Sequence, residues 1–443
     1  MKTKIGMVSL GCPKNGIDAE IMLKKLQNAG YEITPVEADA DVIIINTCGF
    51  IEDAKTEAIE NIIEAARYKD DKLRALIVTG CLAERYRDEI TKEIPEVDVV
   101  VGLGCNNDIV EIVKNALDGN FENRYGEKCD LPLSGDRLLT TPPYTAYLKI
   151  AEGCDNCCTF CAIPLIRGRF RSRPMEEIID EAKTLAKGGV KELVLIAQDT
   201  TRYGEDNYGG RMLPELIEEL AKIDGIRWIR TLYTYPERID DRLLETLATV
   251  DKAVKYLDIP IQHASKSVLK NMNRSGDKER LLSLVNHIRD KVDGVIVRTT
   301  VMTGFPGESE EDFITLCEFI NEAKFDRLGC FAYSEEEGTP AAEMKPQVDP
   351  QIRADRAGHI MEEQQLIAEN KLREQKGKHL DVLIEGYDNY IRHYFGRSYM
   401  DAPEIDGKIF FASDKPLKIG DFERVEITDI LDYDLIGIRE GME

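Results

Sequence analysis

The chain has 443 residues, 43% of them hydrophobic and 32% charged, so it can bury more than one core and is neither disordered nor fibrous. Asp and Glu number 82 against 58 Lys and Arg, and the resulting formal net charge of −24 repels the phosphates of nucleic acids. The sequence contains no run of about 18 uncharged apolar residues and therefore predicts no transmembrane helix and no membrane association.

The first 140 residues alternate short β-branched runs with amphipathic stretches of helical period. The predicted strands cover residues 4–9, 31–36, 41–46, 75–79 and 98–101. Such alternation predicts an α/β domain over residues 1–140, with a doubly wound parallel sheet. Residues 117–143 then lose this period and contain Asp-Gly, Ser-Gly-Asp and Pro-Pro, which are typical of a linker.

A second alternating series follows, with predicted strands at residues 147–151, 192–197, 228–233, 256–260, 295–300 and 328–333. Two of the intervening helices are expected at residues 174–186 and 310–323. Six βα units are too few for a closed eight-fold barrel, so the sequence predicts an open, six-stranded partial (βα) barrel over residues 141–345. Ligands of such a fold bind at the C-terminal ends of the strands.

Two further patterns follow in the C-terminal part of the chain, first a charged helical stretch and then short runs of period two. Asp349 is the expected N-cap before Pro350, and the charged stretch that follows predicts a linking helix within residues 346–375. Residues 376–443 carry short runs of period two at 380–385, 408–411 and 422–429, broken by Gly and Asp. This pattern predicts a small antiparallel β-barrel.

A cysteine-rich loop directly follows the first strand of the second series. It reads Cys154-Asp-Asn-Cys157-Cys158-Thr-Phe160-Cys161, and three thiolates on one loop can ligate three irons of a four-iron cluster, which leaves the fourth iron open. Both C-x3-C-x2-C with Cys158 and C-x2-C-x3-C with Cys157 fit, and the spacing does not choose between them. A closed zinc site is the alternative, but no second Cys pair or His pair supplies its fourth ligand.

Three cysteines in the first domain each follow a predicted strand. Cys12, Cys48 and Cys81 therefore lie along one edge of a parallel sheet, where ligands bind. A single buried cysteine at a strand end is ordinary, since it behaves as a small hydrophobe, but three of them beside Gly or Thr favour a metal site. Cys105 also follows a strand, so the spacing alone admits a fourth ligand.

The C-x3-C-x2-C motif, with an aromatic residue before its last Cys and a place on the first loop of a partial barrel, resembles the radical S-adenosylmethionine superfamily. With the N-terminal cysteines, the chain resembles the methylthiotransferase family, whose members carry a cluster domain, a radical core and a C-terminal TRAM domain. The motifs that carry this resemblance are Ser9-Leu-Gly-Cys-Pro-Lys-Asn15, Asn46-Thr-Cys-Gly-Phe-Ile-Glu-Asp-Ala-Lys55, Leu148-Lys-Ile-Ala-Glu-Gly-Cys-Asp155, Ile166-Arg-Gly-Arg-Phe-Arg-Ser-Arg173, Ala197-Gln-Asp-Thr-Thr-Arg-Tyr-Gly204 and Tyr333-Ser-Glu-Glu-Glu-Gly-Thr-Pro340. They most resemble the branch that modifies an aspartate of ribosomal protein S-twelve.

The resemblance implies two 4Fe-4S clusters per chain and S-adenosylmethionine as cofactors. It makes the cluster ligands Cys154, Cys158 and Cys161 in the core and Cys12, Cys48 and Cys81 in the N-terminal domain, with Cys105 and Cys157 outside both sets. It further implies that one S-adenosylmethionine methylates a sulfur species at the N-terminal cluster. A second one yields the radical that removes hydrogen from the substrate carbon, so the chemistry is driven by the cofactor and needs no catalytic acid/base residue.

Residues that position the cofactor are expected at or just beyond the ends of the predicted core strands. Arg298 has a forked guanidinium that suits the cofactor carboxylate, although a loop ion pair explains it equally well. The full set of expected cofactor contacts is Phe160, Ile163, Pro164, Gln198, Thr200 and Arg298.

The sister branch of the family modifies an adenosine in tRNA, so the substrate must be inferred separately. Residues 376–443 contain nine Lys and Arg against fifteen Asp and Glu, which disfavours RNA and suits a basic ribosomal protein. Tyr387, Tyr390, Tyr394, Phe395 and Tyr399 are able to stack on bases, but packing in a small barrel is the simpler explanation. The resemblance, together with this charge, thus implies methylthiolation of ribosomal protein S-twelve, with electrons from a reductant protein. An iron-sulfur electron carrier or redox sensor is the alternative of another class.

The same sequence predicts a cytoplasmic protein. The apolar residues 5–11 before Cys12 are too few for the hydrophobic region of a signal peptide. In a reducing cytosol the eleven cysteines are expected as metal ligands or small core residues rather than as disulfides.

Overall fold

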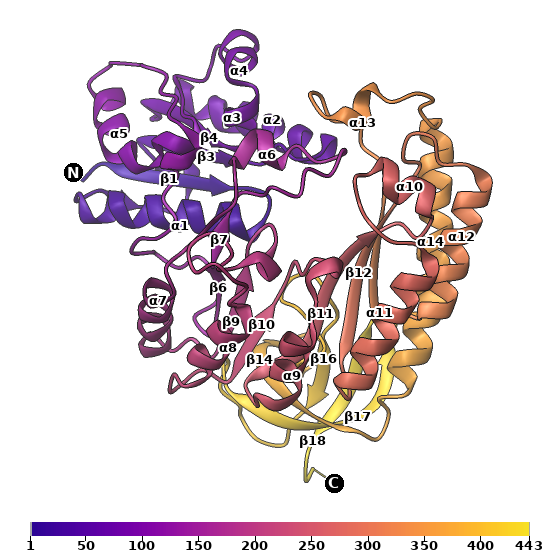
Figure 1. The fold of residues 1–443 in the computed structure, drawn as a ribbon. Helices are drawn as coiled ribbons and strands as arrows, with labels where there is room; N and C mark the ends of the chain where they lie inside the picture. The colour runs from indigo at the N-terminus through magenta and orange to yellow at the C-terminus, as the bar shows by residue number, and fades with distance from the viewer. Residues whose placement is uncertain (1, 443) are drawn as a thin grey trace.

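The computed structural model describes residues 2–442, which form two parallel sheets, a closed barrel and a short two-stranded sheet (Figure 1). Met1 and Glu443, the outer ends of the two predicted terminal domains, lie outside the described residues. Within 2–442, no helix has both the length and the apolar character needed to cross a membrane.

The N-terminal sheet has five parallel strands in the order β2-β1-β3-β4-β5, as the doubly wound prediction requires. Its strands are β1 (Lys4–Ser9), β2 (Glu32–Ile33), β3 (Val42–Thr47), β4 (Ala75–Gly80) and β5 (Val99–Val100). The helices are α1 (Pro13–Asn28), α2 (Glu52–Ala66), α3 (Cys81–Arg85), α4 (Arg87–Glu93) and α5 (Ile109–Leu117). Helices α1 and α5 pack on one face of the sheet and α2 and α4 on the other. Strand β2 is shorter than predicted because it is an edge strand that pairs with β1 over two residues only.

The central sheet has six parallel strands in the order β13-β12-β11-β10-β9-β6. They are β6 (Thr145–Lys149), β9 (Glu192–Ile196), β10 (Trp228–Thr231), β11 (Ala253–Gln262), β12 (Ile296–Thr303) and β13 (Arg327–Ala332). The covering helices are α7 (Met175–Lys187), α8 (Leu213–Ala221), α9 (Asp241–Thr249), α10 (Lys266–Asn271), α11 (Lys278–Lys291) and α12 (Glu310–Ala323). Strands β6 and β13 are the two edge strands of this sheet and do not pair with each other, so the partial barrel is open, as predicted. Figure 1 shows the helices along its outer side.

Short elements connect these parts. Strands β7 (Ala151–Glu152) and β8 (Arg171–Ser172) form an antiparallel pair, and helix α6 (Ile163–Arg167) lies between them in the chain. Helices α13 (Pro340–Glu343) and α14 (Pro350–Arg373) follow the core. Helix α14 is the predicted linking helix, capped by the Asp349 carboxylate, which accepts a hydrogen bond from the backbone N–H of Gln351.

The C-terminal barrel is closed by β14 (His379–Asp388), β15 (His393–Arg397), β16 (Ile409–Ala412), β17 (Phe422–Leu431) and β18 (Asp434–Arg439). Four of its pairs are antiparallel, whereas β16 and β18 run parallel, so the barrel is not antiparallel throughout. The sequence did not predict β15 and β18. Each contains a glycine, which in a sequence is typical of a strand break. At Gly396 a Cβ would lie 2.0 Å from the Leu383 carbonyl oxygen, so strand pairing itself requires glycine there.

The barrel docks on the inner face of the central sheet, near the N-terminal ends of its strands. Glu192, the first residue of β9, is fully buried and accepts hydrogen bonds from Arg397 of the barrel at 2.7 Å and from Arg230 of β10 at 2.9 Å. Trp228 stacks edge to face on Phe422 with ring centroids 4.7 Å apart. The barrel therefore closes the side of the core opposite to the cysteine loop.

We expect Glu192→Gln to destabilise this junction. Although burial alone would raise the pKa of Glu192, the charges of Arg397 and Arg230 lower it to about 2, so the residue is a buried carboxylate held by two cations. The variant leaves Arg230 without a carboxylate partner and Arg397 with Glu385 alone, and breaking such a buried pair costs about 3–5 kcal/mol of unfolding free energy. Urea unfolding followed by the fluorescence of Trp228, the only tryptophan, measures the effect. Asp381→Asn, which breaks an exposed pair with Arg424, is the matched control, and an equal effect of the two would contradict the assignment.

Candidate cluster and cofactor site

The cysteine loop lies at the C-terminal end of β6 and β7, where the partial-barrel prediction placed it. The pKa of Cys154 is raised to about 11 and that of Cys161 to about 12, chiefly by burial, with a smaller contribution from the charge of Cys158. The backbone N–H of Cys161 donates to the Cys158 carbonyl at 3.0 Å. Cys154, Cys158 and Cys161 thus lie close together, and we call them the core trio.

Cys157 is oriented differently from its neighbours. It is exposed and has a φ of 52°, and its carbonyl accepts a hydrogen bond from Asn273 Nδ2 at 3.0 Å. The Sγ atom of Cys158, by contrast, lies 3.7 Å from the Tyr235 hydroxyl, beside the Arg274 guanidinium that stacks on the same ring. This arrangement favours the C-x3-C-x2-C register over the alternative.

The three N-terminal cysteines also come together. Cys12 is the N-cap of α1 after β1, Cys48 follows β3, and Cys81 opens α3 after β4. Burial raises the pKa of Cys48 and of Cys81, the latter to about 12, and the charge of Cys12 raises both. A Cβ on Gly11, whose φ is +85°, would lie 2.8 Å from Cys48 Sγ, so glycine permits this approach. We call Cys12, Cys48 and Cys81 the N-terminal trio.

Cys105 does not join the N-terminal trio. It is half-buried and packs against the sheet core that includes Ile109 and Val101. Burial and the charge of Asp108 raise its pKa. Its surroundings are thus those of a core cysteine.

Helix α6 connects the two trios. It begins two residues after Cys161, and Ala162 and Ile166 pack against Cys81. Arg167, its last residue, donates a hydrogen bond from Nη2 to Cys81 Sγ at 3.4 Å. Because five helical residues rise only about 7.5 Å, the two trios border the same region between the N-terminal sheet and the core.

A buried ionic network joins the two domains beside the trios. Arg167 Nη1 donates to Asp18 Oδ2 at 2.7 Å and to Glu152 Oε2 at 3.1 Å, and Lys149 Nζ contacts the same two carboxylates at 2.7 and 2.9 Å. Burial alone would raise the pKa of Glu152, but Lys149 and Arg167 lower it to about 2. All four charges are therefore paired.

Sequence reasoning missed this network. The signal was present in the predicted strand itself, since Lys149 stands between Leu148 and Ile150 in an otherwise apolar run. Lys149 is fully buried, and a buried lysine requires a carboxylate partner.

Replacing Arg167 with Gln is expected to loosen the contact between α1 and the core. The variant leaves Asp18 and Glu152 with one cation between them, at a cost of about 3–5 kcal/mol in unfolding free energy. Hydrogen exchange should show faster exchange at the amides of α1. Arg124→Gln, which removes an exposed pair with Glu111, should leave α1 unchanged. Unchanged α1 protection in the Arg167 variant would show that the network does not hold the domains together.

Several of the expected cofactor contacts surround the core trio. Phe160 packs beside Met272 and Phe305, and Ile163 and Pro164 open α6, where the Ile163 N–H faces Cys161 and lowers the pKa that burial has raised. Gln198 is the second residue after β9. Gln198 Nε2 donates to Glu152 Oε1 at 2.7 Å, while its buried Oε1 has no hydrogen-bond partner within residues 2–442.

The side chains of Thr200 and Arg298 donate hydrogen bonds to other residues of the chain. The Thr200 hydroxyl donates to the Leu232 carbonyl at 2.9 Å. The sequence predicted Arg298 at a strand end, and this prediction is wrong. Strand β12 continues to Thr303, so Arg298 is its third residue. Its Nη1 donates to Asp258 Oδ1 at 2.8 Å, and its Nε lies 3.8 Å from Asp406 of the barrel. The roles of all six residues in cofactor binding stay predictions.

The residues present fit the implied cofactors. Each trio offers three thiols from a buried or half-buried position, and thiols with raised pKa values become thiolate ligands only when a metal displaces their protons. Three ligands to a four-iron cluster leave one iron open, and the unpartnered Gln198 Oε1 offers an acceptor near the core trio.

Comparison with protein families divides the chain as its fold does. Uncharacterized protein family UPF0004 matches residues 4–102, the radical SAM superfamily matches residues 148–320, and the TRAM domain matches residues 377–439. The match of the closed C-terminal barrel to the TRAM family bears out the third part of the predicted fold.

Solved structures share the fold at low sequence identity. TsrM of Kitasatospora setae, a radical S-adenosylmethionine methyltransferase with cobalamin and a 4Fe-4S cluster bound, superposes with a TM-score of 0.58 at 14% identity over 77% of each chain. OxsB, a cobalamin-dependent S-adenosylmethionine radical enzyme, has a TM-score of 0.50 at 11% identity, over 82% of this chain and 56% of that one. These likenesses show a shared fold.

Sequence relatives are much closer. The ribosomal protein uS12 methylthiotransferase RimO of Thermoanaerobacter sp. (strain X514) is 51% identical over 434 residues, which covers 98% of this chain and 99% of that protein. The protein of the same name from Acetivibrio thermocellus is 48% identical over 445 residues, covering 99% and 98%. The chain therefore belongs to the RimO family of ribosomal protein uS12 methylthiotransferases, radical SAM enzymes with a C-terminal TRAM domain.

Proposed function

We propose that this protein attaches a methylthio group to the β-carbon of an aspartate in ribosomal protein uS12. The observation that carries the proposal is the meeting of two cysteine trios, from two domains, at the two ends of the short helix α6. Family membership at about 50% identity over nearly the whole chain supports the reaction class. An iron-sulfur electron carrier needs neither a second trio nor a partial barrel.

The core trio would hold one 4Fe-4S cluster and the N-terminal trio a second one. The closeness of the thiols supports both sets, since the charge of Cys158 contributes to the raised pKa of Cys154 and Cys161, and that of Cys12 to the raised pKa of Cys48 and Cys81. When bound, the clusters and S-adenosylmethionine supply the radical that removes a hydrogen atom from an unactivated carbon and the methylthio group that replaces it. A reductant protein would donate the electrons.

This chain's own residues would bind and orient the cofactor. Gln198 Oε1 would accept a hydrogen bond from the amino group of S-adenosylmethionine, while its Nε2 stays fixed to Glu152. Phe160, Ile163 and Pro164 would line the apolar side of the cofactor. Thr200 and Arg298 would then act mainly through their present partners, by shaping the loop after β9 and the inner face of the sheet.

The C-terminal barrel supports a protein substrate. Fifteen acidic against nine basic residues in 376–443 give it a negative charge that suits a basic protein and repels RNA. Most of its aromatic side chains are used in packing: Tyr387 and Tyr394 have ring centroids 4.8 Å apart, and the Tyr399 hydroxyl donates to the Gly294 carbonyl at 3.1 Å. Tyr390 is 97% exposed, followed by Tyr433 at 43% and Tyr387 at 41%, and the excess of acidic residues in the barrel disfavours their use as a stacking platform for RNA.

The four segments 1–140, 141–345, 346–375 and 376–443 would act as cluster domain, radical core, linking helix and substrate-binding domain. The ionic network around Arg167 would fix the first two relative to each other, and the Glu192 junction would fix the last. We place the enzyme in the cytoplasm, where ribosomal proteins are made.

The test uses iron-loaded enzyme, a low-potential reductant and S-adenosylmethionine under anaerobic conditions. Separate reactions contain purified uS12 and bulk tRNA. The expected product is uS12 in which one aspartate carries a methylthio group in place of a hydrogen, found by tandem mass spectrometry, with tRNA unmodified. A methylthiolated adenosine in tRNA and unmodified uS12 would favour the sister activity. Neither product, with no cleavage of S-adenosylmethionine, would favour the electron carrier.

A further inference from the structure

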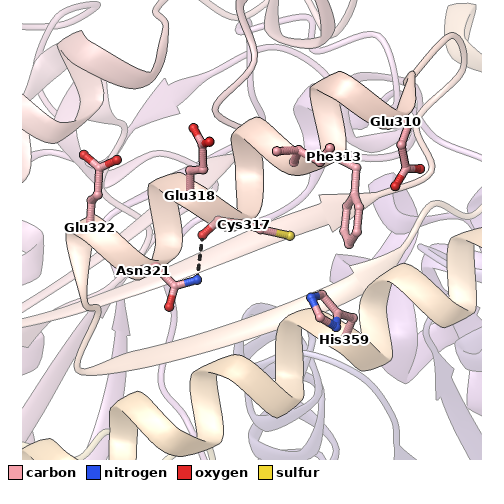
Figure 2. A pocket seen from close by; sticks show the side chains of 8 residues that line it. Glu310, Phe313, Cys317, Glu318, Asn321, Glu322 and His359 are labelled. Atoms are coloured by element: carbon pink, nitrogen blue, oxygen red, sulfur yellow. Dashed lines mark hydrogen bonds between the residues drawn. The ribbon is translucent and has the colours of Figure 1, made fainter.

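A pocket of about 610 Å³ lies between α12 and α14, on helices that carry none of the six cysteines described above. Figure 2 shows Cys317 of α12 and His359 of α14 facing each other across it, with Phe313 beside them. Nothing in the proposed reaction uses these residues. The pocket therefore invites a separate explanation.

Three different ligand types meet at this place. Cys317 Sγ, a ring nitrogen of His359 and a carboxylate oxygen of Glu363 all lie within 4.8 Å of one another. Thiolate, imidazole and carboxylate are the ligands that Zn²⁺ uses in proteins. His359 Nε2 and Glu363 Oε1 are 3.2 Å apart, close to the roughly 3.4 Å that separates two such ligands on a tetrahedral zinc.

The helices hold these groups in place. His359 and Glu363 are four residues apart on α14 and so share one face of the helix. Asn321, four residues after Cys317 on α12, donates from Nδ2 to the Cys317 carbonyl at 3.1 Å (Figure 2). The same Nδ2 also donates to Glu363 Oε2 at 3.0 Å. The carboxylate is thereby oriented with Oε1 toward His359, as an outer hydrogen bond orients the ligands of many metal sites.

The charges around the pocket favour a cation. Glu363 is the carboxylate that faces the thiol, with an oxygen within 4.8 Å of Cys317 Sγ. Glu310, which also lines the pocket, is paired with Arg356, and Glu318 and Glu322 are paired with Lys278. Arg356 and Lys278, the cations near the pocket, are thus paired with other carboxylates, and Glu363 stays available as a ligand.

We propose that Cys317, His359 and Glu363 bind one Zn²⁺ ion, with water as the fourth ligand on the open side of the pocket. Binding releases the thiol proton to solvent and forms the zinc-sulfur bond. The metal would tie α12 of the core to α14, the helix that leads into the C-terminal barrel. This site is independent of the two cysteine trios and of the proposed methylthiolation.

The test measures zinc in the iron-loaded protein after dialysis against a buffer that contains zinc and a competing chelator of known affinity. We expect about one zinc per chain by elemental analysis. X-ray absorption at the zinc edge, which does not see iron, should give one sulfur and three nitrogen or oxygen ligands. A shell of three sulfurs would place the zinc in a cysteine trio and would overturn the proposal. So would the absence of zinc, which would leave an ordinary His359 and Glu363 ion pair.

Variants locate the site. Cys317→Ser should lose the sulfur ligand and reduce bound zinc to background, and Asn321→Ala should weaken zinc binding by about 10- to 100-fold. His287→Gln is the control, because His287 also pairs with a carboxylate, Asp241 at 2.6 Å, but lies outside the pocket. Equal zinc content in the Cys317 variant and the control would contradict the assignment. If Cys317→Ser does not fold, the absorption spectrum of the unaltered protein still decides.

Discussion

Cys158→Ala is expected to abolish the reductive cleavage of S-adenosylmethionine, whereas Cys157→Ala leaves it close to that of the unaltered enzyme. Cys158 lies among Cys154, Cys161 and the Tyr235 hydroxyl, while Cys157 is exposed and its backbone carbonyl is held by Asn273. The measurement is deoxyadenosine formed per chain after anaerobic reconstitution and reduction. Iron in the Cys158 variant should fall from about eight to about four per chain.

The two adjacent cysteines make a matched pair, because each variant removes one thiol from the same loop. Loss of cleavage in the Cys157 variant, with cleavage retained in the Cys158 variant, would establish the C-x2-C-x3-C register instead. Loss in both would mean that the loop tolerates neither change, and circular dichroism would then show whether the fold survives. Retention in both would contradict a cluster on this loop.

Cys81→Ala is expected to separate the two halves of the reaction. Removing one thiol of the N-terminal trio should lower iron to about four per chain and stop methylthio transfer to uS12, while cleavage of S-adenosylmethionine continues at the core trio. Cys81 is buried, and its Sγ accepts a hydrogen bond from Arg167. Its replacement therefore removes both a cluster ligand and the acceptor of that hydrogen bond. Iron content and the mass of uS12 are the readouts.

Cys105→Ala is the matched control for this variant. Cys105 also follows a strand of the N-terminal sheet, but it is half-buried in that sheet's core rather than among the trio. It should keep about eight irons per chain and full transfer. A loss of iron in the Cys105 variant equal to that in the Cys81 variant would make Cys105 the fourth ligand that sequence spacing allows.

The sequence predicted the parts of the site that follow from strand order. In a parallel sheet every C-terminal strand end lies on the same edge, so residues that follow β1, β3 and β4 had to be neighbours. The same rule placed Gln198 near the cysteine loop, since β9 pairs with β6. Strand β1 and helix α12 even begin and end where their patterns predicted.

The sequence did not predict the contacts between domains. The pairing of Arg298 with Asp406 and of Glu192 with Arg397 depends on how the barrel docks on the core, which no local period encodes. The same holds for Asp18 and Arg167, which are 149 positions apart in the chain. A residue that the sequence suggests as a cofactor contact can therefore belong to a contact between domains, and Arg298 is an example.

Anomalous diffraction at the iron edge, from crystals of the anaerobically reconstituted enzyme, tests the central claim most directly. The account predicts two separate iron sites, one bonded to the sulfurs of Cys154, Cys158 and Cys161 and the other to those of Cys12, Cys48 and Cys81. Both should border the region beside α6. A single iron site, or iron bonded to Cys157 or Cys105, would contradict it.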